Sequence, residues 1–212
     1  IVNSAENSTK DFGPTSNVIS HTKCASNVIQ SSSPMFISIG NTIMGNPGEA
    51  KYGFTLDQLK EGLRILKAQG VTAFGLHAFL SSNTTHSAYF PQLAEQLMTL
   101  GKELAAENGL RFAFFDLSGG IGIPYRPEEK ETDIEAVGDG VRRVYEKIFP
   151  EGGVGIKTEL GRWMTGPVGW LVTHAVHEKK IYRDYIGVDA SAVNLMRPAM
   201  YGAYHHITVC GK

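Results

Sequence analysis

Three short stretches follow apolar runs and contain the residue types from which a ligand site is built. They read HAFLSSN at 77–83, SGGIG at 118–122 and TELGR at 158–162. Glycines at the end of a strand let backbone N–H groups approach an anion closely, and phosphate is the usual anion. A tight turn between a strand and a helix explains a single glycine loop equally well. Three such stretches in series favour a ligand site.

The segments between these stretches alternate between helical and strand patterns. Thr55 with Gln58 matches a capping box that begins a helix, and Thr132 with Glu135 matches a second one. The leucines of the first helix recur on one face, whereas the predicted strands are apolar and short. The predicted helices cover 55–70, 87–109 and 132–149, and the predicted strands cover 71–80, 110–117 and 154–160.

Strands that are apolar almost throughout are typical of a parallel sheet covered on both faces, so the fold class is α/β. In such folds, ligands bind at the carboxyl ends of the strands. After Gly166 two extended segments with a turn between them predict a β-rich module. We therefore predict an irregular lead-in at 1–35, a partial (β/α) barrel at 36–165 and the start of a β domain at 166–212.

Composition narrows the classes of partner. The 212 residues include 20 basic and 21 acidic side chains, a net charge of -1, so no basic field exists to bind nucleic acid. No apolar run approaches the roughly 18 residues of a membrane span, and no secretory signal pattern begins the chain. Cys24 and Cys210 lie far apart in no metal-binding spacing. We expect two reduced thiols in a cytoplasmic protein.

The order of the motifs resembles the diaminopimelate decarboxylase family. The shared motifs are GLHAFLSSN, FDLSGGIGIPY, TELGR and VDASAVNLMRPAMYGAYH, preceded by AKYGF, and the resemblance runs from about Gly40 to the C-terminus. Members are pyridoxal-phosphate enzymes with a TIM barrel followed by a β domain. The resemblance implies pyridoxal 5′-phosphate (PLP) as cofactor, an amino acid as small-molecule substrate, and a homodimer with active sites built across its interface.

The resemblance also implies residues that bind the cofactor. Phe79 stands where the family has a histidine that stacks on the cofactor ring, and phenylalanine can also stack. Glu159 matches the catalytic acid that faces the pyridine nitrogen, where a carboxylate keeps that nitrogen protonated. A family serine that binds phosphate and a family triple glycine correspond here to Ser82 and to Ser118, Gly119 and Gly120.

Substrate binding is implied for Arg162, Arg197 and Tyr201, since a guanidinium group suits a carboxylate. The family motif has a proline shortly before the residue that Arg162 matches, and this chain has Leu160 there. Each implied residue also has a simpler explanation. The alternatives are a core position for Phe79, a helix cap for Ser82, an ion pair between Glu159 and Arg162, and interface packing for Arg197 and Tyr201.

The histidines offer a different chemistry, metal binding. His174 and His177 lie three residues apart, and positions three apart on a strand face opposite sides. The His177–Glu178 pair lacks the second histidine of a zinc-protease motif. We therefore predict no metal site. His205 matches the family's terminal motif better, as a structural residue or one at the rim of the pocket.

The family's reaction needs a lysine that forms a Schiff base with the cofactor, on a strand well upstream of GLHAFL. Lys23 is a poor candidate, because its context SHTKCASN has no apolar strand before it. The family's later cysteine–glutamate motif is also missing, so we expect a central fragment that is inactive alone. We predict a decarboxylase that converts meso-diaminopimelate to lysine. The alternatives are a relative acting on ornithine, arginine or carboxynorspermidine, and a non-catalytic barrel with a regulatory role.

Overall fold

The computed structural model describes residues 53–211. The predicted lead-in at 1–35, Lys23, Cys24 and most of the AKYGF motif lie outside these residues. The elements, in chain order, are α1 (Leu56–Ala68), β1 (Phe74–His77), α2 (Tyr89–Asn108), β2 (Phe112–Asp116), α3 (Ile134–Ile148), β3 (Gly155–Lys157), α4 (Gly161–Thr165), a 3₁₀ turn η4 (Gly166–Val168), β4 (Ala175–Lys180), β5 (Asp184–Val188) and α5 (Met196–Tyr201).

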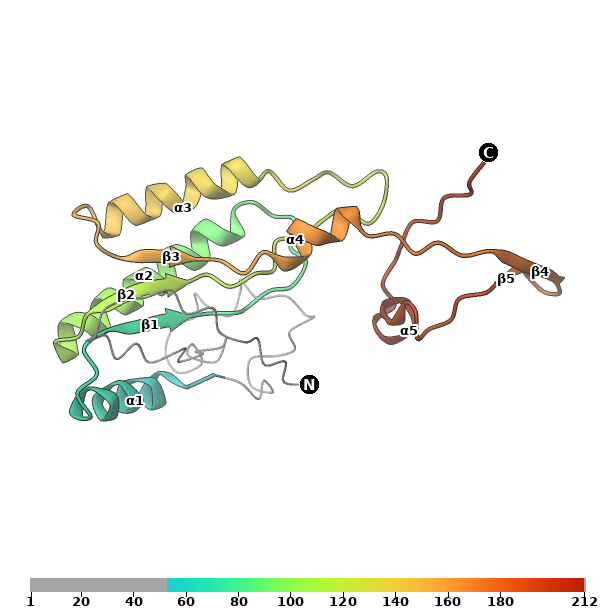
Figure 1. Ribbon diagram of the computed structural model, residues 1–212. Helices are drawn as coiled ribbons and strands as arrows, with labels where there is room; N and C mark the ends of the chain where they lie inside the picture. Colours follow the sequence, from blue (N-terminus) through green and yellow to red (C-terminus); the bar gives the residue numbers. More distant parts are fainter. Residues whose placement is uncertain (1–52, 212) are drawn as a thin grey trace, which may run out of the picture.

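The first three strands form a parallel sheet in the order β1-β2-β3, as the apolar runs predict. The register places His77 opposite Asp116, and Asp116 opposite Lys157. All three strands therefore end at the same edge of the sheet, which Figure 1 shows as the edge to which the arrows point. The loops that leave this edge are the three stretches that the sequence singles out.

One face of the sheet packs against the helices and forms the core. Phe115 on β2 has no exposed surface, and its ring stacks on Phe112 and on Phe149 with centroids 5.6 Å apart in both pairs. Gly101 on α2 lets the helix approach this ring, because a Cβ atom there would overlap it. The side chains on this face therefore fix how the helices lie on the sheet.

The opposite face has a different row of side chains across the three strands. Gly75 pairs with Phe114, and Phe114 pairs with Gly155. The Phe114 ring lies over Gly75, where a Cβ atom would overlap it, and the Lys157 ammonium lies 3.9 Å from the ring centroid. This row of small, large and small residues lies one layer below His77 and Asp116, toward the amino ends of the strands.

The helix ends confirm one predicted capping box and correct the other. Thr55 and Gln58 exchange both bonds of the box at the start of α1. At α3 the prediction is wrong, because the cap is Asp133, whose carboxylate accepts from Ala136 N–H. Thr132 is buried and donates instead to the Gly122 carbonyl at 2.9 Å. A buried hydroxyl needs a partner, and the loop before α3 supplies it.

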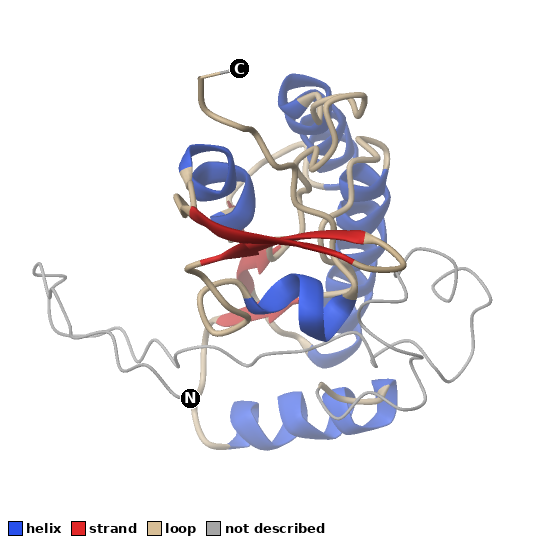
Figure 2. Ribbon diagram, turned by 90° about the vertical axis from the view of Figure 1, so that its right-hand side faces the viewer, coloured by secondary structure: helices blue, strands red, loops and turns tan. Residues whose placement is uncertain are grey.

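Beyond α4 the chain forms the predicted pair of extended segments, an antiparallel hairpin of β4 and β5. Figures 1 and 2 place this hairpin beyond the carboxyl ends of the parallel strands, and α5 follows it. Many of its apolar side chains are exposed, with Val176 at 58% and Ile186 at 60%. None of the helices in residues 53–211 is long and apolar enough to cross a membrane.

Candidate active site

Backbone hydrogen bonds join the three loops at the carboxyl edge of the sheet. Thr84 N–H donates to the Gly120 carbonyl at 2.8 Å, and Gly122 N–H donates back to the Thr84 carbonyl at 2.7 Å. On the other side of this middle loop, Glu159 N–H donates to the Ser118 carbonyl at 2.8 Å. The loop at 118–122 therefore lies between the loops that follow β1 and β3 and is bonded to both.

The glycines of the middle loop are required by this close approach. A Cβ atom on Gly119 would overlap the carbonyl oxygen of Glu159, and one on Gly120 would overlap that of Ser81. Gly120 also has a φ of 96°, which side chains disfavour. The sequence predicted bare backbone for the approach of an anion. The structure shows an additional reason, the contact between neighbouring loops.

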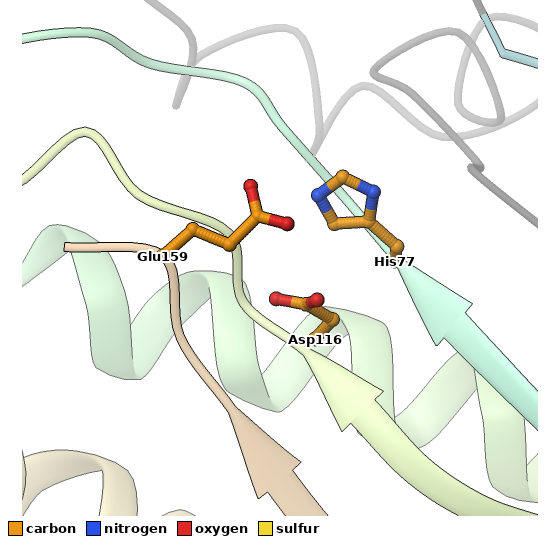
Figure 3. A group of neighbouring side chains, drawn as sticks. All are labelled: His77, Asp116 and Glu159. Carbon is orange, nitrogen blue, oxygen red and sulfur yellow. The ribbon is translucent and has the colours of Figure 1, made fainter. Parts of the chain in front are cut away.

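Three polar side chains gather where these strands end: His77, Asp116 and Glu159. One ligand-type atom from each lies within 4.8 Å of the other two. Figure 3 shows the two carboxylates and the imidazole turned toward one another, each from a different strand end. Asp116 is buried, and its Oδ1 accepts from Ser118 N–H at 2.8 Å. Glu159 is exposed, and its Oε2 lies 3.5 Å from the Ser118 hydroxyl, a long hydrogen bond.

His77 and Asp116 are site residues that the sequence analysis missed. Each is the single polar residue at the end of an apolar strand, in the contexts GLHAF and FFDLS. That signal was available in the sequence. What the sequence could not supply is the register, which sets His77 directly opposite Asp116.

Phe79 and Ser82 extend from the same strand end. Phe79 is half-buried, lies two residues beyond His77 and does not belong to the hydrophobic core of the described residues. Within residues 53–211 the alternative of a plain core position for Phe79 therefore finds no support. Ser82 does not cap α2, whose N-cap residue is Ala88, and it lies beside Gly120. The cofactor roles implied for both residues stay predictions.

The two arginines meet at the ring of Tyr125. Arg162 Nη1 lies 3.4 Å from the Tyr125 hydroxyl, and the Arg197 guanidinium lies 4.7 Å from the ring centroid. Arg197 Nη1 is also 3.1 Å from Nε2 of His205, whose ring packs edge-on against Tyr125. In residues 53–211 neither arginine pairs with a carboxylate. The simple ion pair of Arg162 with Glu159 is therefore not formed.

Tyr201 does not join this cluster of Arg162, Arg197, Tyr125 and His205. It is the last residue of α5 and is 71% exposed. Within the described part of the chain it has no hydrogen bond or ring contact with the two arginines. Its implied role in substrate binding stays a prediction.

The arginine cluster should respond to pH through His205. Burial, then the charges of Arg197 and Arg162, lower the pKa of His205 below its ordinary 6.5. The neutral ring accepts a hydrogen bond from Arg197, so this contact stabilises the fold above about pH 6.5 and is lost as pH falls through the lowered pKa. We expect NMR titration of the His205 ring to give a midpoint below 6.5. Arg197→Met should raise that midpoint, because a neighbouring cation is removed; an unchanged midpoint would contradict the contact.

Comparison with known proteins identifies a family. The family model described as "Pyridoxal-dependent decarboxylase, pyridoxal binding domain" matches residues 35–166. Protein TabA of Pseudomonas amygdali pv. tabaci is 33% identical over 84% of this chain and 42% of its own length. Diaminopimelate decarboxylase of Methanothermobacter thermautotrophicus is 34% identical over 77% of this chain and 39% of its own.

The fold agrees with that match. The crystal structure of diaminopimelate decarboxylase from M. jannaschii in complex with L-lysine superimposes with a TM-score of 0.69 at 25% identity, over 76% of this chain and 38% of the other. The chain thus spans about two fifths of the length of these relatives. Its parallel sheet is part of a PLP-binding (β/α) barrel, and an antiparallel hairpin follows it. The chain belongs to the family of pyridoxal-dependent decarboxylases.

Proposed function

We propose that the chain forms part of a PLP-dependent amino-acid decarboxylase whose substrate is meso-diaminopimelate and whose product is L-lysine. The observation that supports this most is the meeting of the glycine loop at 118–122 with the His77, Asp116 and Glu159 side chains at one edge of the sheet. Two relatives supply the substrate class. One is named diaminopimelate decarboxylase, and a similar structure is described in complex with L-lysine.

The residues at this edge fit PLP. Ser82 and the loop of Gly119 and Gly120 offer hydroxyl and backbone groups side by side, as a phosphate requires. The Glu159 carboxylate suits a protonated ring nitrogen, and the buried His77 Nε2 atom near it has no partner in the described residues, so this edge keeps an unused hydrogen-bonding group. When bound, PLP supplies an aldehyde for the substrate amine and a ring that accepts electrons. Glu159 would hold the proton at the ring nitrogen.

The two arginines support a substrate that contains a second carboxylate. Arg162 and Arg197 converge on Tyr125 without an acidic partner in residues 53–211, so two guanidinium groups are left to bind an anion. A guanidinium group binds carboxylate oxygens with two parallel hydrogen bonds. Diaminopimelate keeps a carboxylate at its far end after the D-centre has lost CO₂ and gained a proton. Ornithine and arginine have no carboxylate at that end.

We also propose that the whole protein is a homodimer. The exposed apolar side chains of the segment at 164–209 support this, since a free surface of this kind favours association. Light scattering of the 212-residue chain should give a mass above that of a monomer. A monomer at high concentration would contradict the proposal.

The test of the proposed function is binding of PLP, followed by release of CO₂. The 212-residue chain should bind PLP saturably, and inorganic phosphate should compete; no saturable binding would contradict the cofactor site.

We expect the chain alone to release no CO₂ from meso-diaminopimelate above background. In the M. thermautotrophicus relative, replacing the matching segment with this chain should give CO₂ release from meso-diaminopimelate and not from ornithine or arginine. Release from ornithine instead would contradict the proposed substrate.

A further inference from the structure

One ring nitrogen of His77 lacks a hydrogen-bond partner within residues 53–211. Its Nε2 atom is buried and has no hydrogen-bond partner among the described residues. Leaving such a group unpaired is unfavourable, and unpaired groups of this kind in native proteins usually face a ligand or serve a function. In Figure 3 the far side of the imidazole ring, which contains Nε2, is turned toward the Glu159 carboxylate. The two residues come from the ends of β1 and β3, the outer strands of the sheet.

Glu159 needs a second contact, because little in the described residues fixes its side chain. It lies two residues beyond the end of β3 and is exposed. Its backbone is held by the Ser118 carbonyl, but its carboxylate has only the long contact of 3.5 Å with the Ser118 hydroxyl. A carboxylate that must meet one ring nitrogen in a fixed direction gains from a donor on its other oxygen.

We propose that His77 is a positioning residue that donates a hydrogen bond from Nε2 to the Glu159 carboxylate and so aligns it with the pyridine nitrogen of PLP. This inference rests on the proposed function, because it concerns the same cofactor. The imidazole and the carboxylate have ligand-type atoms within 4.8 Å, so a small side-chain rotation brings them into hydrogen-bond distance. Glu159 then has one oxygen for His77 and one for the cofactor.

Two neighbouring charged groups, Asp116 and Lys157, have contacts of their own. Asp116 accepts from Ser118 N–H and thereby holds the backbone of Ser118, which has a φ of 58°. The Lys157 ammonium lies over the Phe114 ring, one layer below. The His77 Nε2 nitrogen, which has no partner among the described residues, is therefore available to Glu159 in addition to the Ser118 hydroxyl.

The test compares PLP with 1-deazapyridoxal 5′-phosphate, an analogue in which a carbon replaces the ring nitrogen. The measurement is the dissociation constant of each for the 212-residue chain, by equilibrium dialysis. His77→Leu removes the donor, and we expect it to weaken PLP binding by about 10- to 100-fold, the typical range for a hydrogen bond to a charged group. The analogue should bind with unchanged affinity. His77→Gln places an amide N–H near the position of Nε2 and should restore most of the affinity for PLP.

A double-mutant cycle with Glu159→Gln tests whether His77 affects PLP binding through Glu159. If His77 acts through Glu159, His77→Leu should cause little further loss of PLP affinity in the Glu159→Gln background. The matched control is His86→Leu, the same change at an exposed position in the loop before α2, which should leave both affinities unchanged.

The outcomes separate the two hypotheses. Equal losses for PLP and the analogue in His77→Leu would show a merely structural role and overturn this inference, as would no loss for either. In both cases the proposed cofactor site would stand. If the unchanged chain bound neither compound, the proposed cofactor site would fail and this inference with it.

Discussion

Gly120→Ala is expected to weaken PLP binding by at least about 100-fold and to lower the free energy of unfolding by about 2 kcal/mol. Two effects act together at this position. A φ of 96° is strained for any residue with a Cβ atom, and the Cβ atom would overlap the Ser81 carbonyl. Backbone atoms cannot rotate away as a side chain can, so the loop after β1 must move and take Ser82 with it. Dialysis against PLP and urea unfolding measure the two effects.

The matched control for this change is Gly138→Ala. Gly138 lies within α3, and a Cβ atom there meets nothing within 4 Å. Alanine is the better helix former, so this variant should be more stable by up to about 1 kcal/mol and should bind PLP unchanged. If Gly120→Ala bound PLP as the unchanged chain does, the contact of the glycine loop with Ser82 would not matter for the cofactor.

Phe115→Ala should lower the free energy of unfolding by about 3–5 kcal/mol, the typical cost of removing a buried aromatic side chain. Its ring has no exposed surface and contacts β2, α2 and the residue after α3 at once, so its loss leaves a cavity shared by three elements. Urea unfolding followed by circular dichroism measures this.

The control for Phe115 is Ile65→Ala on α1, where the side chain is 43% exposed. We expect it to cost about 1 kcal/mol or less, since little apolar surface is returned to water. Similar losses for the two variants would mean that the described core is not the main source of stability.

The parallel sheet was predictable because its strands are apolar runs between clear helix signals. Where the prediction was imprecise, the reason is physical. The strand predicted at 71–80 pairs only over Phe74–His77, because the chain beyond His77 turns into the site and leaves the ladder. The wrong cap at Thr132 arose because Thr and Asp both satisfy the capping pattern, and burial beside Gly122 decided between them.

The site was predictable only where a motif marked it. The glycine loop and Glu159 are recognisable from their neighbours in the sequence, whereas the meeting of Arg162 and Arg197 at Tyr125 joins residues far apart in the chain. His77 shows the same limit. A single histidine after an apolar run has many ordinary explanations, and only the geometry shows a buried nitrogen facing a carboxylate.

The row of Gly75, Phe114 and Gly155 beneath the site restricts how the sequence can vary. The Phe114 ring on the central strand occupies the space that a side chain at Gly75 would need, whereas a Cβ atom at Gly155 would meet Phe114 only at ordinary contact distance. Gly75 and Phe114 therefore share one volume. A larger residue at Gly75 requires a smaller one at Phe114, so viable variants at these positions should arise as pairs. A larger residue at Gly75 alone would displace the Phe114 ring, which lies in the layer directly beneath His77 and Asp116, and so would disturb the site without altering any residue in it.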